Sequence, residues 1–248
     1  LSIGVQSFDD EVLRILGRAH DAEAARAAVR AAQERFENVS VDLMCGIPGQ
    51  SAESFAESVR EAVALGVAHV SVYPLTIEPH TPFDRAVMRG EMDEPDEDVE
   101  GAAMEEARLI LEDAGFHRYE VASYARPGFE SRHNTAYWTG KPYLGLGRSA
   151  VNAERRMRVQ DGQVVDDLDA RQMAAEDLML GMRMARGVSD EQVARAAAVI
   201  DDAASTAASS GSMTPGSETG SVLAAFDELA SLGLVKHADG RWRPTDAG

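Results

Sequence analysis

The sequence predicts an α/β fold that is followed by a mostly helical C-terminal region. Short β-rich segments alternate with amphipathic helical segments from residue 1 to about residue 124, which is the pattern of repeated βα units around a parallel sheet. The alternation then stops in a stretch rich in glycine and aromatic residues. The tail has the pattern of helices followed by a small β-wing, so we expect a winged-helix-like unit at the end of the chain.

In the first part, apolar β-rich runs bounded by turn residues mark the strands. We expect four of them, at residues 1–7, 38–44, 68–74 and 117–123. Residues 22–36 are rich in strong helix formers, and Ser51 suits the N-cap of a second helix. A third helix is expected to begin near Pro95 and to end at Gly115, since glycine often follows the last turn of a helix.

The later part of the chain has its own local signals. A hairpin is expected over residues 156–166 around an Asp-Gly turn, followed by a helix over 170–186. Ser189 and Gln192 form a capping-box pattern for the next helix. Residues 234–236 then have the pattern of a strand.

These changes of pattern predict three domains. Residues 1–124 form the parallel-sheet domain, 125–175 a connecting region, and 176–248 the winged-helix-like domain. Within the last domain, residues 202–220 are mostly Ala, Ser, Thr and Gly, a composition typical of a flexible linker.

Composition excludes several classes of function. A formal charge of −18 repels phosphate backbones, so we expect no nucleic-acid binding. No apolar run approaches the ~20 residues of a membrane-spanning helix, and we expect a cytoplasmic protein. The single Cys45 cannot by itself hold zinc or an iron–sulfur cluster. Because Leu1 already lies in a strand-like run, we also expect the chain to begin inside a larger fold.

Polar residues stand at the expected C-terminal ends of the strands, where βα loops carry the functional site of a parallel barrel. Gln6 ends the first strand, Asp42 lies near the end of the second, and Thr76 follows the third. Asp42 is in an apolar context, where an unpaired carboxylate is costly. It has two interpretations, a structural hydrogen bond to a neighbouring strand or to Arg18, and contact with a ligand; Gln6 has the same two kinds of role open to it.

A second candidate site lies in the segment His133–Trp138, which holds an imidazole, an amide and two aromatic rings. His133 could ligate haem iron, while Tyr137 or Trp138 stacks on the macrocycle. The alternative is an aromatic anchor that holds an irregular segment in place, with His133 simply hydrogen-bonded. The residues alone favour the anchor.

Together these motifs resemble the HemW-type proteins, relatives of the oxygen-independent coproporphyrinogen III oxidase in the radical S-adenosylmethionine (SAM) family. The matching segments, in chain order, are Leu1–Phe8, Leu16–Arg18, Val41–Gln50, Thr76–Pro79, His133–Trp138 and Tyr143–Gly147. The resemblance implies the C-terminal half of a (βα)6 partial barrel, with strands four to six, before the helical region.

The resemblance also implies binding residues. Gln6, Arg18 and Asp42 match positions that contact SAM, and Thr76 is a further candidate. Arg18 would pair with a carboxylate of the cofactor. His133 becomes the leading candidate for the axial haem ligand, with Tyr137 and Trp138 beside it in the haem motif. No catalytic residue is implied.

The Cys-x-x-x-Cys-x-x-Cys loop that binds the family's [4Fe–4S] cluster is not in this sequence. We expect its ligands upstream, and we expect the chain as it stands neither to build the cluster nor to cleave SAM. The resemblance implies a haem chaperone that passes haem to acceptor proteins, with possible peripheral membrane association. The alternative is the oxidase, which decarboxylates coproporphyrinogen III, so whether the protein is an enzyme stays open. A third hypothesis is an acidic interaction module built on the winged tail.

Overall fold

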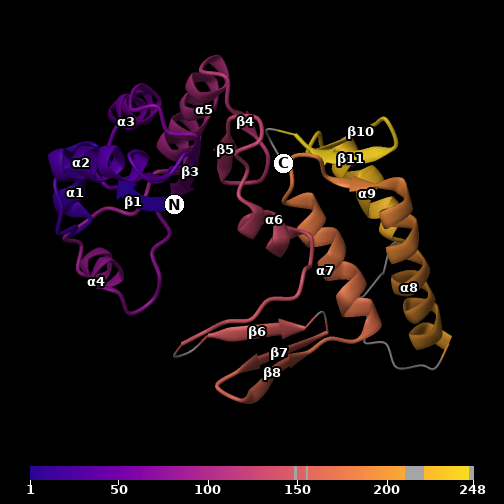
Figure 1. Cartoon of the computed structure of the whole chain (residues 1–248). Helices are drawn as coiled ribbons and strands as arrows, with labels where there is room; N and C mark the ends of the chain where they lie inside the picture. The colour runs from indigo at the N-terminus through magenta and orange to yellow at the C-terminus, as the bar shows by residue number, and fades with distance from the viewer. Residues whose placement is uncertain (148–149, 155, 210–220, 246–248) are drawn as a thin grey trace. The chain divides into compact units, whose positions relative to one another are not determined.

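The computed structural model divides the chain into two compact units, the N-terminal unit Leu1–Glu130 and the C-terminal unit Ser131–Gly248 (Figure 1). The structure describes the whole chain except residues 148–149, 155, 210–220 and 246–248, and it describes residues 203–209 by their backbone alone.

The N-terminal unit contains one five-stranded sheet in the order β1-β2-β3-β5-β4. Its strands are β1 (Ser2–Gln6), β2 (Ser40–Cys45), β3 (His69–Pro74), β4 (His117–Arg118) and β5 (Ser123–Ala125). The first three are parallel neighbours, as the sequence predicts, and the mixed α/β fold is confirmed.

The prediction of one strand over residues 117–123 is wrong. The chain turns there, with the Ser123 amide donating to the Glu120 carbonyl at 3.3 Å, so two short strands form in place of one. β5 inserts between β3 and β4 and pairs with both in the antiparallel sense.

Five helices accompany this sheet within the described residues. They are α1 (Asp10–Ile15), α2 (Ala22–Gln33), α3 (Ala52–Ala64), α4 (Pro82–Met88) and α5 (Glu97–Asp113). Ser51 caps α3 by accepting from the Ser54 amide, as predicted. The third predicted helix begins slightly later than Pro95, because the Asp96 side chain caps it by accepting two backbone amides.

The two faces of the sheet differ in polarity because side chains alternate along each strand. On one face, apolar residues of the strands pack with α2, α3 and α5 in a continuous core. Val41 and Leu43 of β2 are fully buried there. Asp42, between them in β2, is on the opposite face, where it accepts a hydrogen bond from Ser2 of β1. One face is therefore packed and the other is free to carry polar groups.

The C-terminal unit contains two small antiparallel sheets and four helices within the described residues. The helices are α6 (Arg132–Trp138), α7 (Ala170–Met182), α8 (Asp190–Ser209) and α9 (Val222–Ser231). One sheet is formed by β6 (Val151–Glu154), β7 (Met157–Gln160) and β8 (Gln163–Asp167), and the other, in the order β10-β11-β9, by β9 (Val188–Ser189), β10 (Val235–Ala238) and β11 (Arg241–Pro244).

The local predictions for this unit are mostly confirmed. β7 and β8 form the predicted hairpin, to which β6 adds a strand that the sequence did not indicate. The predicted capping box is present, since Ser189 and Gln192 each accept a hydrogen bond from the backbone amide of the other. These bonds fix the beginning of α8.

Residues 202–209, the beginning of the expected linker, belong to α8. Their alanine-rich composition explains this, since alanine has the highest helix propensity. The rest of the expected linker, residues 210–220, lies outside the described residues.

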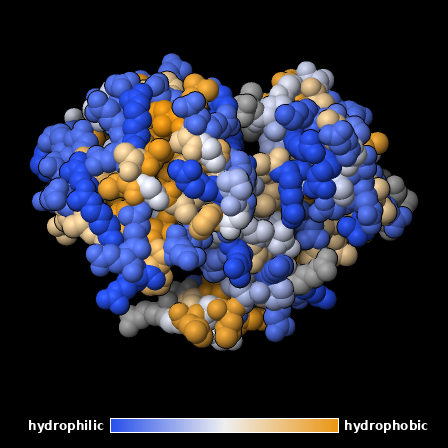
Figure 2. Space-filling view, turned by 45° about the horizontal axis from the view of Figure 1, so that its top comes forward, coloured by the Kyte–Doolittle hydropathy of each residue, from blue (hydrophilic) through white to orange (hydrophobic). Residues whose placement is uncertain are grey.

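The core of the C-terminal unit is small. Its cluster of buried residues is Val188, Val193, Phe226, Val235 and Trp242. Large apolar side chains such as Leu144 and Leu146 stay exposed, and Figure 2 shows apolar residues gathered in patches among hydrophilic ones on one face of the molecule. In the described parts of the chain, no helix is long and apolar enough to cross a membrane.

Candidate functional site

The end of β1 has a strained backbone. Gln6 is its last residue and has φ of 67°, a left-handed conformation that residues other than glycine adopt rarely. Such strain persists only where surrounding contacts enforce it, and it often marks a functional position. Gln6 is therefore held in an unusual orientation at the C-terminal end of a parallel strand.

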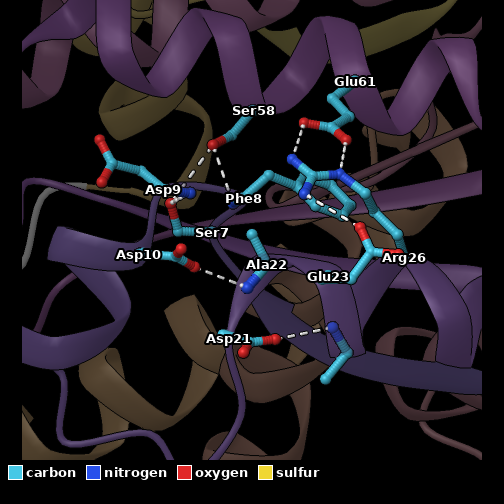
Figure 3. A network of polar contacts seen from close by, with 11 residues as sticks. Ser7, Phe8, Asp9, Asp10, Asp21, Ala22, Glu23, Arg26, Ser58 and Glu61 are labelled. Carbon is cyan, nitrogen blue, oxygen red and sulfur yellow. Dashed lines mark hydrogen bonds and ion pairs between the residues drawn. The ribbon is translucent and has the colours of Figure 1, made fainter.

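The contacts that enforce this orientation begin one residue later. The buried Ser58 hydroxyl of α3 accepts from the Phe8 amide at 3.1 Å and lies 3.3 Å from the Ser7 hydroxyl (Figure 3). Ser7 in turn accepts from the Asp9 amide at 3.0 Å. The loop after β1 is thus anchored to a helix that packs in the core.

Ion pairs and a capping contact hold the adjacent helices in register. Arg26 of α2 forms a two-pronged pair with Glu61 of α3, and the second contact, from Nη2 to Oε2, measures 3.0 Å (Figure 3). Asp10 of α1 accepts from the Ala22 amide of α2 at 2.8 Å. These contacts connect α1 with α2 and α2 with α3 around the end of β1.

Gly4 leaves the space into which two predicted site residues turn. A Cβ atom at position 4 would lie 2.7 Å from Gln6 Nε2 and 3.7 Å from Arg18 Nη2. The side chains of Gln6 and Arg18 therefore converge above the same stretch of β1. Within the described part of the chain no carboxylate pairs with the exposed Arg18, so its guanidinium can receive an anionic group.

Asp42 lies on the neighbouring strand. Its Oδ2 accepts from the Ser2 hydroxyl at 3.1 Å, so the hydrogen bond to a neighbouring strand is present. The hydrogen bond to Arg18 that we considered is not among the contacts of the described residues. Since Gln6 pairs in register with Leu43, the residue after Asp42, the two polar side chains stand on adjacent strands close to the same level.

Thr76 is set apart from these three residues. It is exposed, two residues beyond the end of β3, and among the described residues no hydrogen bond joins it to Gln6, Arg18 or Asp42. The structure thus brings Gln6 and Arg18 together, places Asp42 on the adjacent strand and leaves Thr76 at the loop.

The sequence did not single out a buried polar network on β3. His69 Nδ1 lies 2.7 Å from the Ser40 hydroxyl and His69 Nε2 lies 2.9 Å from the Tyr119 hydroxyl. Burial lowers the pKa of His69 to about 4, so the ring is neutral at neutral pH. The signal was available, since His69 and Ser71 alternate with the buried Val70 and Val72.

A second unforeseen contact covers the turn after β2. Gly46 has φ of 73°, and a Cβ atom there would meet the Glu100 carboxylate of α5. Burial, with help from Glu97 and Asp96, raises the pKa of Glu100. This partly desolvated carboxyl group stands beside the turn of the Gly46–Gln50 segment.

The described residues do not fit an iron–sulfur cluster. Burial raises the pKa of Cys45 to about 12, which disfavours the thiolate that ligates iron. No group of three or more His, Cys, Asp or Glu side chains in the described parts of the chain could hold a metal ion.

The side chains of the predicted haem motif point in two directions from α6. His133 is exposed, and its ring lies edge-on to Tyr137, one helical turn later, with centroids 4.7 Å apart. Tyr137 also contacts Tyr143 at 4.6 Å. Trp138 instead lies under the Arg183 guanidinium, at 4.5 Å. The structure brings His133 and Tyr137 together and turns Trp138 toward the end of α7.

Comparisons with known proteins show which family the chain belongs to. The profile of the Radical SAM superfamily matches residues 1–62. The chain is 35% identical over 214 residues to "Heme chaperone HemW" of Synechocystis, covering 77% of this chain and 52% of that protein. It is 44% identical over 151 residues to the Mycobacterium tuberculosis protein of the same name, covering 60% of this chain and 39% of that protein.

A solved structure matches the whole chain. It is coproporphyrinogen III oxidase (HemN) from Escherichia coli, titled a radical SAM enzyme, with a TM-score of 0.72 and 21% identity, covering 100% of this chain and 61% of that one. At this identity the likeness shows the fold alone. The chain spans about half the length of the first curated relatives it matches. It belongs to the radical SAM superfamily and is homologous within it to the proteins named haem chaperone HemW.

Proposed function

We propose that this protein binds haem for transfer to acceptor proteins, and that His133 is the axial ligand. The observation that carries this proposal is the position of His133, an exposed imidazole with Tyr137 edge-on beside it. An exposed imidazole can coordinate iron, and the aromatic side chains give a planar macrocycle a surface to pack on. The name that the curated relatives share supports haem as the ligand.

We further propose that Gln6, Arg18 and Asp42, with Thr76 at the loop, hold SAM. The space over Gly4 supports this, because Gln6 and Arg18 both turn into it. Arg18 would bind the carboxylate of the cofactor's amino-acid part, and the side-chain oxygens of Gln6 and Asp42 would accept from its polar groups. Bound SAM supplies a sulfonium group. Its cleavage needs a [4Fe–4S] cluster, for which the described residues offer no ligand set.

A haem titration followed by the Soret band tests the first proposal. The wild-type chain should bind haem, and His133→Ala should weaken binding by roughly tenfold or more, since loss of one strong contact of ~1.4 kcal/mol gives that factor. His80→Ala is the matched control, because His80 is also exposed but lies in the N-terminal unit. Equal affinities for the wild type and His133→Ala would refute His133 as the ligand.

The oxidase remains the second candidate, because the HemN structure matches the whole chain in fold. Coproporphyrinogen turnover separates the two functions when it is assayed on a longer protein that carries the cluster loop together with this chain, because the described residues offer no ligands for the cluster that SAM cleavage needs. Haem binding without turnover supports the chaperone. Turnover without stable haem binding supports the oxidase and contradicts our proposal.

A SAM titration tests the second site. Gly4→Ala should weaken SAM binding by roughly tenfold or more, because the new methyl group occupies the position toward which Gln6 turns. Gly101→Ala is the control, since a Cβ atom there meets nothing within 4 Å. Arg18→Gln should weaken SAM but not decarboxylated SAM. Equal losses for the two ligands would contradict the proposed role of Arg18.

A further inference from the structure

A hollow of ≈ 700 Å³ lies within the C-terminal unit, lined by α6, α7, the start of α8 and β11. α6 and α8 both pack against α7 (Figure 1). The volume is within the usual range for small-molecule sites, roughly 300–1,000 Å³. α7 has no fully buried residue, so this helix does not fill the space with packed side chains.

Part of the wall of the hollow is apolar, although polar groups form the larger share of its surface. Trp138, Met173, Leu180 and Met184 are among its lining residues. The methionine side chains can adapt to a bound surface, because thioethers are flexible and polarisable. Trp138 adds a flat ring, on which Arg183 is already stacked from outside the lining. Such a mixed wall suits a ligand that has both a flat apolar part and charged groups.

The lining of the hollow includes three arginines, Arg186, Arg195 and Arg241. Arg241 lies beside the backbone of Arg186, since its Nε donates to the Arg186 carbonyl and its Nη2 to the Gly187 carbonyl, at 2.8 Å each. Arg195 begins the second turn of α8, and its one ion pair in the described structure is a 3.5 Å contact to Glu191. Asp177 is the one acidic residue in the lining. The excess of arginine over acidic residues in this lining contrasts with a chain whose formal charge is −18.

We propose that this hollow binds a planar apolar ligand with carboxylate side chains, of the class of porphyrins with propionate groups. The carboxylates lie at Arg186 and Arg195, while Arg241 is held by two backbone carbonyls, and the ring lies along α7 against Trp138 and the methionines. Arginine suits this role because its planar group binds carboxylates in a two-pronged manner. The proposal rests on the proposed function for the choice of a tetrapyrrole, and it adds a contact surface separate from His133.

Metal-free protoporphyrin IX is the probe, because it has no iron for His133 to ligate. Its binding to the full chain is followed by porphyrin fluorescence, beside its dimethyl ester, which lacks both negative charges. We expect the free acid to bind and the ester to bind at least tenfold more weakly. Equal binding of acid and ester, or no binding of either, would overturn the proposal.

Variants locate the site. Arg186→Gln removes one cation without changing the carbonyl that accepts from Arg241, and it should weaken the free acid about tenfold. Arg171→Gln, an exposed position of α7 outside the lining, is the matched control and should have no effect. Ala174→Trp should block the hollow and abolish binding of both porphyrins while the circular dichroism spectrum is retained. Unchanged binding in Arg186→Gln and Ala174→Trp would refute this location.

His133→Ala separates this proposal from the proposed function. It should reduce haem affinity and leave metal-free porphyrin unchanged. If haem binding depends on His133 but metal-free porphyrin does not bind, the haem function stands and the hollow is refuted. If metal-free porphyrin binds through Arg186 but haem is indifferent to His133, the hollow stands and His133 is refuted as the ligand.

Discussion

The two units of the chain differ in how extensively their residues are packed. In the N-terminal unit one face of a sheet is fully packed under α2, α3 and α5, and Phe55 and Leu43 are completely enclosed. In the described part of the C-terminal unit the buried cluster is much smaller, and a large hollow remains beside α7. The large packed core therefore lies in the N-terminal unit, and the hollow lies in the C-terminal unit.

Charge follows the same division. Residues 1–130 contain 26 Asp and Glu against 11 Lys and Arg, whereas residues 131–248 contain 16 against 13. The acidity of the chain thus belongs mainly to the N-terminal unit. A near-balanced C-terminal unit can gather arginines at one site, where an anionic ligand would be attracted without strong repulsion from its surroundings.

The substitution with the largest expected effect tests whether the N-terminal unit unfolds independently of the C-terminal unit. Phe55→Ala should cost about 3–5 kcal/mol, because it opens a cavity at a fully buried position. Hydrogen exchange should then lose protection in β2 and α3, while α9 and β10 keep theirs. Phe36→Ala, at a half-exposed position, should change stability by less than about 0.5 kcal/mol. Equal loss of protection in both units would show that they unfold together.

In the C-terminal unit, Gly187→Ala tests a close backbone approach. A Cβ atom there would lie 1.8 Å from the Trp242 carbonyl oxygen, and φ is 59°. The left-handed conformation costs about 1–2 kcal/mol for an alanine, and the overpacking adds about 1–3 kcal/mol. Gly233→Ala has a similar φ of 74° but meets nothing within 4 Å, so chemical denaturation should show only the smaller loss. Equal losses would mean that the close approach has no consequence.

The pH dependence of stability should differ between the units because of His69. Its pKa is about 4 when folded and ~6.5 when unfolded, so the unfolded state binds more protons between these values. Stability is complete above about pH 6.5 and decreases by up to about 3 kcal/mol as the pH falls to 4. Denaturation of wild type and His69→Gln across this window measures the effect. His80→Gln, at an exposed position, should keep the wild-type pH dependence of stability. If His69→Gln also keeps it, groups other than His69 cause the pH dependence.

The smallest expected effect is a substitution that stabilises the N-terminal unit alone. Gly101→Ala in α5 meets no neighbouring atom within 4 Å. Alanine in a helix is favoured over glycine by about 0.5–1 kcal/mol. Thermal unfolding of the N-terminal unit should therefore shift upward by a few degrees, and a decrease would show that the position is packed in solution.

Local features of the fold could be predicted because they depend on neighbours in the chain. The Ser51 cap, the Ser189–Gln192 capping box and the hairpin turn were all recognisable from residues within a few positions of each other. The prediction failed over residues 117–123, where an apolar run divides between two strands. That outcome depends on β5 pairing with β3, a contact between segments about fifty residues apart.

The candidate site was predictable in part. Gln6, Asp42 and His133 were recognisable from their residue types and from the family resemblance. The convergence of Gln6 and Arg18 over Gly4, and the contact of Glu100 with the Gly46 turn, were not. These contacts arise when the packing of helices on the sheet brings distant loops together, and no pattern in a short window reports them.

The sequence by itself determined the family, the three parallel strands and the beginnings of α2, α3, α7 and α8, because hydrophobic alternation and capping act over a few residues. The short helices α1, α4 and α6 were not predicted. The tertiary structure decided the strained conformation of Gln6, the neutral state of buried His69, the separation of Trp138 from His133 and the three arginines in the lining of the hollow. These features depend on which distant side chains share a small volume, and only the packed chain specifies that.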